Sequence, residues 1–450
     1  MKKAALHNLG CKVNAYETEA MQQLLEEAGY EIVPFFEQAD VYVINTCSVT
    51  NLADRKSRQM LHRAKKQNPD SIVVAAGCYV QTAGEQAGAD PAIDILIGNN
   101  RKHELPGLLA EYERDMQAGK RALRREVVDI NDTGAAGGYE SLAIRRTAEH
   151  TRAFVKIQDG CDQFCSYCII PYARGRVRSR SRSDLLKEIR ALAQNGYQEV
   201  VLTGIHLSSY GADTGDSLLS LIEEIHKLPG ISRIRLGSLE PKIVTEEFAQ
   251  ALSVLPKVCP HFHLSLQSGC DETLRRMNRK YSCEEYRQGC GYLRNYFDHP
   301  ALTTDIIVGF PGETEEEFAA TRRFLQEIAF FEVHIFKYSV RRGTRAAGME
   351  GQIPEQVKAE RSSILFGDTE PMSQSFAAWY LGKTLEILVE ERIQLADGEY
   401  YTGHTPEYIR VEIPVFEGDG QINRVVKCRA ESLTENHILR CRPILTENMD

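Results

Sequence analysis

The sequence predicts an α/β protein in three parts: an N-terminal parallel α/β sheet domain, a partial (βα)6 TIM-type barrel and a small C-terminal antiparallel β-barrel. Two observations predict this fold class. Short apolar strands alternate with helical segments from residue 2 to about residue 338, which is typical of parallel sheets. After a helical connection, short β-rich segments separated by turns recur over residues 384–433, as in small barrels.

Composition narrows the class of protein. A chain of 450 residues can form two or three domains. A net charge of -9 argues against bulk nonspecific nucleic-acid binding but allows a local basic groove. The sequence has no apolar run long enough for a membrane span and no signal-peptide pattern at its start. We therefore expect a cytoplasmic protein without membrane contact, whose twelve cysteines serve metal binding or catalysis.

In the N-terminal part, three predicted strands each lead to a cysteine. We expect strands over residues 2–8, 31–34, 41–44, 71–76 and 93–97, and helices from Asn14 to about residue 29 and over 53–67 and 105–112. Glu17 is the expected capping-box partner of Asn14. Because parallel strands bring their carboxyl ends to one edge, Cys11, Cys47 and Cys78 should form a three-thiolate site there. The alternative is three small buried residues at strand ends.

The predicted domains are residues 1–125, a glycine-rich linker over 126–150, residues 151–373 and residues 374–443. In the central domain we expect strands over 153–157, 199–202, 233–236, 262–266, 302–308 and 333–338. Helices over 184–194, 218–228, 246–255, 272–277, 283–297 and 315–328 separate them. The active residues of such barrels lie at the carboxyl ends of the strands.

Cys161, Cys165 and Cys168 follow the first of these strands within eight residues. Zinc usually takes four protein ligands. A four-iron cluster usually takes four cysteines, so three would leave one iron open to a substrate. A zinc loop or three unrelated buried cysteines are the alternatives.

This loop resembles the signature of the radical S-adenosylmethionine (SAM) enzymes. The resemblance implies that Cys161, Cys165 and Cys168 are the catalytic ligands of a [4Fe-4S] cluster that binds and cleaves SAM. Tyr167 matches the aromatic residue of the pattern. The candidate SAM contacts are Tyr167 and residues at the later strand ends, namely Thr203, Gly204, Glu240, Gln267 and Asp305.

Two three-cysteine sites in one chain resemble the methylthiotransferases, whose N-terminal domain holds an auxiliary cluster. This implies Cys11, Cys47 and Cys78 as its ligands, and two [4Fe-4S] clusters in all. Residues 9–17, 45–51 and 54–59 are similar to motifs of the MtaB-type tRNA enzymes, and the last module looks like a TRAM domain. The resemblance implies methylthiolation of carbon 2 of threonylcarbamoyladenosine at tRNA position 37. Sibling enzymes acting on isopentenyl adenosine or on a ribosomal-protein aspartate stay open, as does a noncatalytic metal-cluster RNA-binding protein.

Basic residues near the cluster loop predict an RNA surface. They lie on the helix over 53–67 and in the stretch after the loop: Arg55, Lys56, Arg58, Arg174, Arg176, Arg178 and Arg180. The C-terminal module adds Tyr400, Tyr401, Tyr408, Arg410 and Lys427. The expected partners are the tRNA anticodon loop, an electron donor such as flavodoxin or ferredoxin, and a sulfur source.

Overall fold

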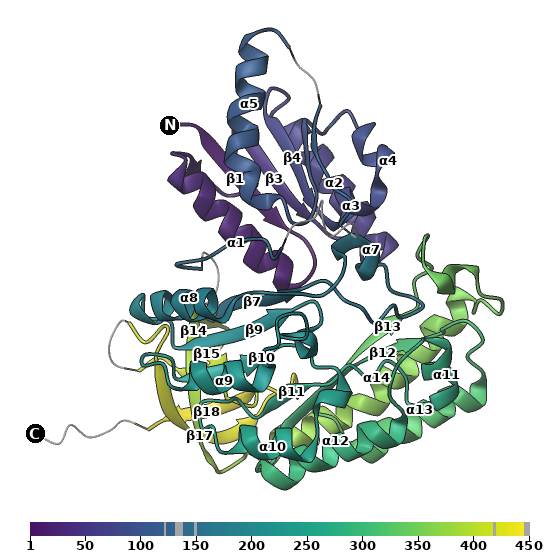
Figure 1. The fold of residues 1–450 in the computed structure, drawn as a ribbon. Helices are drawn as coiled ribbons and strands as arrows, with labels where there is room; N and C mark the ends of the chain where they lie inside the picture. The colour runs from purple at the N-terminus through teal and green to yellow at the C-terminus, as the bar shows by residue number, and fades with distance from the viewer. Residues whose placement is uncertain (121–122, 131–137, 148–150, 417–419, 445–450) are drawn as a thin grey trace, which may run out of the picture.

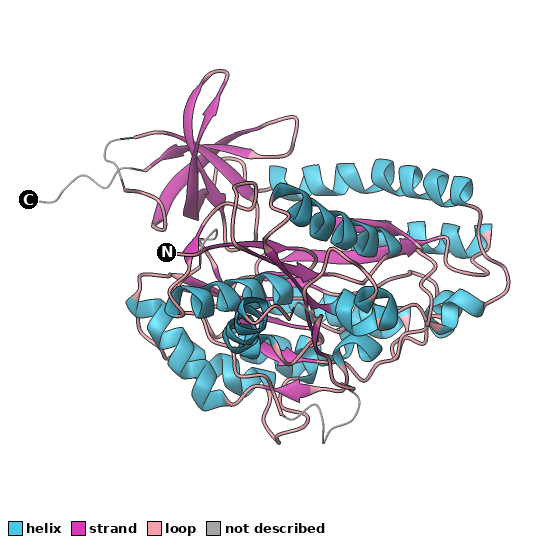
Figure 2. Cartoon of the chain, turned by 90° about the horizontal axis from the view of Figure 1, so that it is seen from above, coloured by secondary structure: helices cyan, strands magenta, loops and turns pink. Residues whose placement is uncertain are grey.

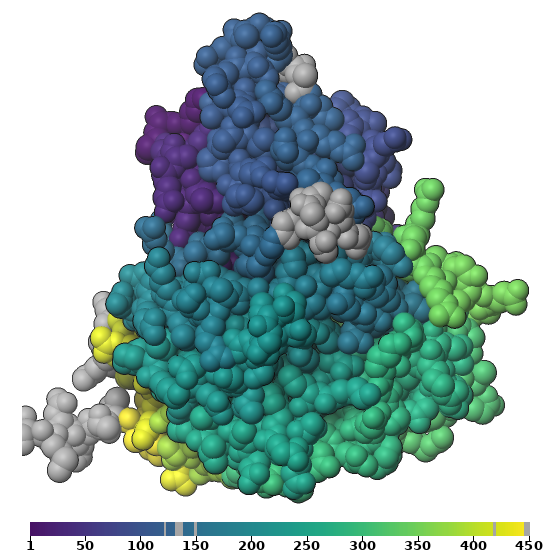
Figure 3. Space-filling model, in the orientation of Figure 1, coloured from purple at the N-terminus to yellow at the C-terminus, as the bar shows by residue number. Residues whose placement is uncertain are grey.

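The computed structural model describes residues 1–120, 123–130, 138–147, 151–416 and 420–444. An N-terminal domain lies on a central strand-and-helix domain, and a small barrel packs at the other end of the latter (Figures 1 and 3). The predicted fold class is confirmed. Among the described residues, no helix has both the length and the apolar character that crossing a membrane requires.

The N-terminal sheet is parallel throughout, in the order β2-β1-β3-β4-β5-β6. Its strands are β1 Lys3–Asn8, β2 Glu31–Ile32, β3 Val41–Thr46, β4 Ile72–Gly77, β5 Ile95–Ile97 and β6 Arg124–Glu126. Sequence reasoning missed β6, because three charged residues at a sheet edge carry no apolar pattern. Its helices are α1 Lys12–Glu27, α2 Asn51–Gln67, α3 Cys78–Ala83, α4 Glu85–Gly88 and α5 Leu105–Gln117.

Period-two alternation gives this sheet a core on each face. On β3, Val41 and Val43 pack with residues of α1 and α5, whereas Tyr42 and Ile44 pack with residues of α2. The expected capping box is wrong: Cys11 is the N-cap of α1, and the carboxylate of Glu17 is fully buried among cations. The helix therefore begins earlier than Asn14, directly after the first cysteine.

The central domain is a partial barrel in two sheets, β8-β7-β9-β10 and β11-β12-β13. An isolated bridge between Leu239 and Leu264 links the sheets, and only the short edge strand β8 is antiparallel. The strands are β7 Ala153–Asp159, β8 Arg178–Ser179, β9 Glu199–Gly204, β10 Arg233–Leu236, β11 His261–His263, β12 Ala301–Val308 and β13 Glu332–Lys337. We did not predict β8, since it lies within the arginine-rich stretch.

Helices cover the outer face of these strands (Figure 2). They are α8 Arg182–Gln194, α9 Leu218–His226, α10 Glu246–Ser253, α11 Asp271–Arg276, α12 Cys283–Tyr296, α13 Glu315–Ile328 and α14 Glu355–Ala378. The short α7 Ile170–Arg174 packs instead against α3 of the N-terminal domain. Leu202, Leu236 and Ile306 belong to the core on this outer side. By alternation, residues such as Arg235 and Asp305 face the inside of the barrel.

Part of the predicted linker packs against the barrel. Leu142 and Ile144 belong to the same core as β7, although the glycine-rich residues 134–137 lie outside the described part of the chain. We keep the domain boundaries as a proposal.

The C-terminal module is a closed barrel in the order β14-β15-β16-β18-β17. Its strands are β14 Thr384–Leu395, β15 Gly398–His404, β16 Arg410–Pro414, β17 Val425–Leu433 and β18 Leu439–Pro443. One pair, β16 with β18, is parallel rather than antiparallel. Tyr400 and Tyr401 are buried, so the prediction that they contact RNA is wrong.

This module is attached to the central barrel through two buried arginines of β10. Arg233 donates to the carbonyls of His404 and Glu386, both at 2.9 Å, and Arg235 donates to the carbonyl of Pro406 at 2.8 Å. The guanidinium of Arg235 also lies 4.7 Å from the Tyr408 ring centroid and 2.7 Å from Glu199. Tyr408 is therefore part of a domain contact at the amino ends of the strands.

Replacing Arg235 by Met should destabilise the protein by about 3 kcal/mol, because it leaves the buried carboxylate of Glu199 without its main partner. Thermal unfolding followed by intrinsic fluorescence would show a lowered midpoint. The matched control is Lys227→Met, which removes an exposed charge on the outside of the barrel. Equal midpoints for the two variants would contradict the role given to Arg235.

Candidate active site

The central cysteine loop follows β7 and is fixed by main-chain contacts. Cys161 donates its amide to the carbonyl of Gly175 at 3.0 Å, and Ser166 donates its amide to Met277 at 2.9 Å. Gly160 has φ +74, and a Cβ there would lie 1.8 Å from the carbonyl oxygen of Arg176. Glycine is therefore required where the strand turns into the loop.

The three thiols of this loop lie close enough to influence one another electrostatically. Burial, together with the neighbouring thiols, raises the pKa of Cys161 to about 11 and that of Cys168 to about 12. Nη1 of the half-buried Arg279 lies 3.2 Å from Sγ of Cys165 and supplies a positive charge. Thiolates in such a place need strong cationic partners, which a metal centre provides.

The N-terminal cysteines gather as the parallel sheet predicts. Cys11, Cys47 and Cys78 follow β1, β3 and β4, which are neighbours in the sheet, and the charges of the three act on one another. Gly10 has φ +103, and a Cβ there would lie 2.8 Å from Sγ of Cys47. The glycine thus lets Cys47 approach the chain beside Cys11.

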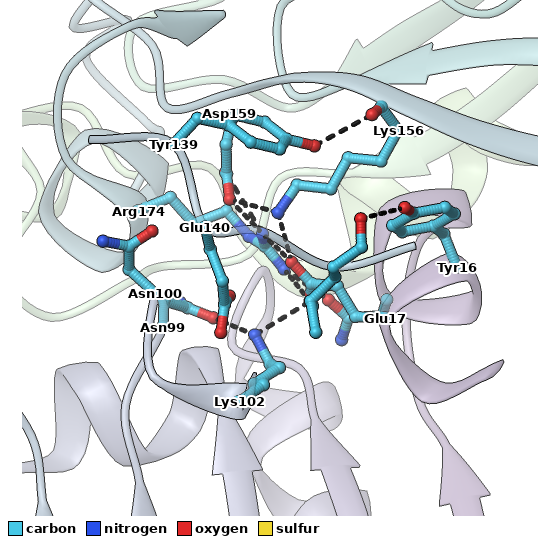
Figure 4. Close-up of polar contacts among 12 residues, drawn as sticks. Tyr16, Glu17, Asn99, Asn100, Lys102, Tyr139, Glu140, Lys156, Asp159 and Arg174 are labelled. Atoms are coloured by element: carbon cyan, nitrogen blue, oxygen red, sulfur yellow. Dashed lines mark hydrogen bonds and ion pairs between the residues drawn. The ribbon is translucent and has the colours of Figure 1, made fainter. Parts of the chain in front are cut away.

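A buried ion network joins residues of the N-terminal domain to residues of the central domain (Figure 4). Arg174 binds Glu17 at 2.9 Å and Asp159 at 3.1 Å, and Lys156 binds the same two carboxylates at 2.7 and 2.6 Å. Lys102 binds Glu17 at 2.9 Å. Burial opposes the charge of Glu17, but these three cations outweigh it and hold its pKa well below the ordinary range.

The three cations of this ion network outnumber its two carboxylates by one. The excess positive charge lies near the N-terminal cysteines. Glu140, drawn beside it, pairs with His103 at 3.2 Å. Nε of Arg174 is buried without a hydrogen-bond partner, and Arg174 interacts electrostatically with Cys78, Cys11 and Cys47. An anionic thiolate-bound cluster would balance that charge, so the residues present fit a [4Fe-4S] group.

α7 connects the two cysteine sites. Asn99 contacts Sγ of Cys78 at 3.5 Å and donates to the carbonyl of Ala173 at 2.7 Å. The carbonyl of Gly175, two residues after Ala173, accepts a hydrogen bond from the amide of Cys161. Both sites therefore open toward the same region of the molecule.

The candidate SAM contacts lie at the barrel's carboxyl ends or on its inner face. Tyr167 packs against Phe310 at 6.4 Å, and Glu240 is buried with one carboxylate oxygen unpartnered. Thr203 and Gly204 end β9, while Gln267 donates its amide to the carbonyl of Asp305 at 2.8 Å. Their contacts with SAM stay a prediction.

The arginine-rich stretch does not form the expected surface. Arg174 is fully buried, and Arg180 is buried against Glu188 at 2.9 Å, so the prediction that these two contact RNA is wrong. Arg178 lies mostly buried beside Asp159, and only Arg176 is exposed. The acidic partners come from distant segments, which a local count of charges does not reveal. On α2, Arg55 and Lys56 are exposed and Arg58 is half-buried over Tyr79.

Sequence reasoning missed several site residues. Glu17 was assigned to a helix cap, and Arg279 and Lys12 stand in no pattern that indicates a role. His263 and His334 are isolated histidines on strands. Only the pairing of β11, β12 and β13 brings these histidines together with Asp305.

Comparison with known proteins agrees with this geometry. Residues 155–325 match the radical SAM superfamily, and residues 3–98 match the uncharacterized protein family UPF0004. In fold, the chain is similar to the radical SAM methyltransferase TsrM from Kitasatospora setae, with a TM-score of 0.55, 14% identity and 75% and 72% of the two chains covered. The central domain with its cysteine loop is thus a radical SAM domain.

Relatives over nearly the whole chain define the family more closely. Threonylcarbamoyladenosine tRNA methylthiotransferase MtaB of Bacillus subtilis (strain 168) is 41% identical, covering 95% of this chain and 94% of that protein. The protein of the same name in Aquifex aeolicus (strain VF5) is 38% identical, covering 94% of this chain and 100% of that protein. A tRNA-2-methylthio-N(6)-dimethylallyladenosine synthase of Acetivibrio thermocellus is 37% identical, covering 90% of this chain and 84% of that protein. The chain belongs to the MtaB family of methylthiotransferases, which confirms the resemblance.

Replacing Arg174 by Met should remove the charge that balances the N-terminal cysteine site. We expect anaerobically reconstituted R174M to bind about half of the roughly eight irons that two clusters hold, by iron and sulfide analysis. The exposed Arg176→Met is the matched control and should bind as much as the unmodified protein. Full iron content in R174M, with normal folding by circular dichroism, would contradict the role of this charge.

Proposed function

We propose that the protein transfers a methylthio group to carbon 2 of threonylcarbamoyladenosine at position 37 of tRNA. The observation that carries the proposal is the presence of two three-cysteine sites on either side of α7. The relatives named for this activity, up to 41% identical over 95% of the chain, support the same substrate. An anticodon loop also suits the reaction, because its bases can leave their stack at little cost.

Six cysteines would hold the resident cofactors. Cys161, Cys165 and Cys168 would bind one [4Fe-4S] cluster together with SAM, and Cys11, Cys47 and Cys78 would bind a second. When bound, these groups supply a carbon radical that removes the hydrogen from carbon 2 and a centre that carries the sulfur. Carbon 2 has no acidic proton, so general acid–base chemistry offers no route.

The side chains around the cysteine loop shape this chemistry. Within the loop, the ring of Tyr167 packs edge-on against Phe310. Arg279 donates to Sγ of Cys165 and to the carbonyl of Ser265, so it holds a positive charge at the thiolate. Tyr167, Thr203, Gly204, Glu240, Gln267 and Asp305 are our proposed contacts to SAM.

Other parts of the proposal rest on what the reaction consumes and on which basic side chains are exposed. The exposed Arg55, Lys56 and Arg176 are the proposed phosphate contacts. A SAM-cleaving cluster needs an electron, so we include a donor such as flavodoxin or ferredoxin, and the product needs a sulfur source. We place the protein in the cytoplasm, where its tRNA substrate is found.

Two cysteine variants test the separate roles proposed for the central and the N-terminal cysteine sites. Cys165→Ala should abolish 5′-deoxyadenosine formation from SAM under dithionite, measured by chromatography. Cys47→Ala should retain deoxyadenosine formation and lose only the methylthio nucleoside. Undiminished deoxyadenosine in C165A would contradict the proposed radical chemistry.

The substrate itself can be tested with two RNAs. We expect reconstituted protein to convert tRNA carrying threonylcarbamoyladenosine to its 2-methylthio form, detected by mass spectrometry of the digested RNA. The parallel reaction uses tRNA carrying dimethylallyladenosine, because relatives named for that substrate are also similar. Conversion of only the dimethylallyl RNA would overturn the proposed substrate and keep the enzyme class.

A further inference from the structure

The inner face of the central barrel carries a group of polar and aromatic side chains, of which the chemistry above uses Asp305 alone. We call Lys12, His263, Asp305, His334 and Phe336 the inner patch. Val333 and Ile335 pack toward the outer core, so His334 and Phe336 face inward from β13. His334 and Phe336 of the inner patch therefore lie on the inside of the barrel.

Three of its residues form a tight cluster. The ligand atoms of His263, Asp305 and His334 all lie within 4.8 Å of one another. Nε2 of His263 is 3.2 Å from the Asp305 carboxylate, and its Nδ1 is 3.0 Å from the Thr303 hydroxyl. The His334 ring stacks on His263 at 5.6 Å, with 43% of its side chain exposed. His334 is thus the member free to meet a ligand.

Lys12 brings a positive charge to the same face from the N-terminal domain. It is the residue after Cys11, and it interacts electrostatically with Asp305, Arg235 and Arg152. His261, on β11 beside β12, interacts electrostatically with Lys12, His263 and His334. In the described part of the chain, no carboxylate lies within 4.0 Å of the Lys12 ammonium group. A positive charge so surrounded favours an anionic ligand.

Phe336 supplies a flat apolar surface beside these charges. It is two residues from His334 on the same face of β13, and 52% of it is exposed. An exposed ring on an inward strand face is typical of a platform on which an unstacked base can lie. The inner patch thus joins a base-stacking surface to cationic and hydrogen-bonding groups.

The charged groups around the inner patch favour an anion over a metal ion as its ligand. His263 contacts the Thr303 hydroxyl through Nδ1, and its Nε2 lies 3.2 Å from the Asp305 carboxylate without a hydrogen bond. A metal ion would also meet the positive charge of Lys12. Arg235 is paired with Glu199 at 2.7 Å and Arg152 with Glu390 at 3.2 Å, whereas Lys12 has no such partner among the described residues. Glu332 lies 3.6 Å from Nδ1 of His334. A carboxylate of the substrate, held by Lys12 and His334, would pair with the Lys12 charge.

We infer that Lys12 and His334 bind the carboxylate of the threonylcarbamoyl group while Phe336 stacks on its adenine. This inference rests on the proposed function and names the residues that read the substrate. A dimethylallyl group is a hydrocarbon and would leave Lys12 without a partner in this space. The inner patch therefore selects for the amino-acid substituent of the base.

Binding of anticodon stem-loop RNAs to the reconstituted full-length protein tests the inference. The probes carry adenosine, threonylcarbamoyladenosine or its methyl ester, which lacks the negative charge. We expect the unmodified protein to favour the free acid roughly tenfold over the ester, as for hydrogen bonds to charged groups. Lys12→Met and His334→Gln should each lose this preference and still bind the adenosine RNA. Phe336→Ala should weaken binding of all three RNAs and keep the preference.

The remaining outcomes separate the inference from the proposed function. Lys227→Met, an exposed lysine on the outside of the barrel, is the matched control and should keep the preference. Iron analysis shows whether Lys12→Met disturbs the neighbouring Cys11, and His334→Gln is free of that concern. If both variants keep the preference while the unmodified protein methylthiolates the RNA, the inference fails alone. A non-cluster metal that His334→Gln removes would also overturn it.

Discussion

The architecture depends on a buried ion network between the N-terminal domain and the central barrel. Glu17 comes from α1, Lys102 from the turn before α5, Lys156 and Asp159 from β7, and Arg174 from α7. Removing one partner from such a network costs about 3–5 kcal/mol, because a buried charge is left unpaired. The network also sets the geometry of the active site, since Asp159 precedes the loop of Cys161 and Arg174 lies beside Cys78.

Burying these charges has consequences for substrate binding. The arginines of the stretch after the cluster loop are divided between structure and surface: Arg174 and Arg180 hold the domains together, while Arg176 faces solvent. The positive surface offered to RNA is therefore smaller than the sequence indicates. Its other exposed members, Arg55 and Lys56, lie on α2 of the N-terminal domain. An RNA that uses both sets must contact the two domains together.

The C-terminal barrel closes the other end of the molecule. Arg233 and Arg235 bind its main chain from the amino-end side of β10, and Tyr408 stacks against Arg235. Both cysteine sites lie at carboxyl ends of strands. In the proposed reaction the base therefore enters from the cysteine side, and its substituent lies deeper in the barrel against the inner patch.

Local patterns in the sequence determined the strand–helix alternation and indicated the six cysteines that we propose as cluster ligands. They did so because apolar strands and closely spaced thiols are signals carried by neighbouring residues. A parallel sheet brings its strand ends to one edge, so even the gathering of Cys11, Cys47 and Cys78 followed from sequence. Only the tertiary structure decided which charges are buried and which residues share the barrel interior. Glu17 pairs with Arg174, and Lys12 interacts electrostatically with Asp305, across more than a hundred residues of chain. Pairing of this kind depends on how domains pack, and no local pattern records it.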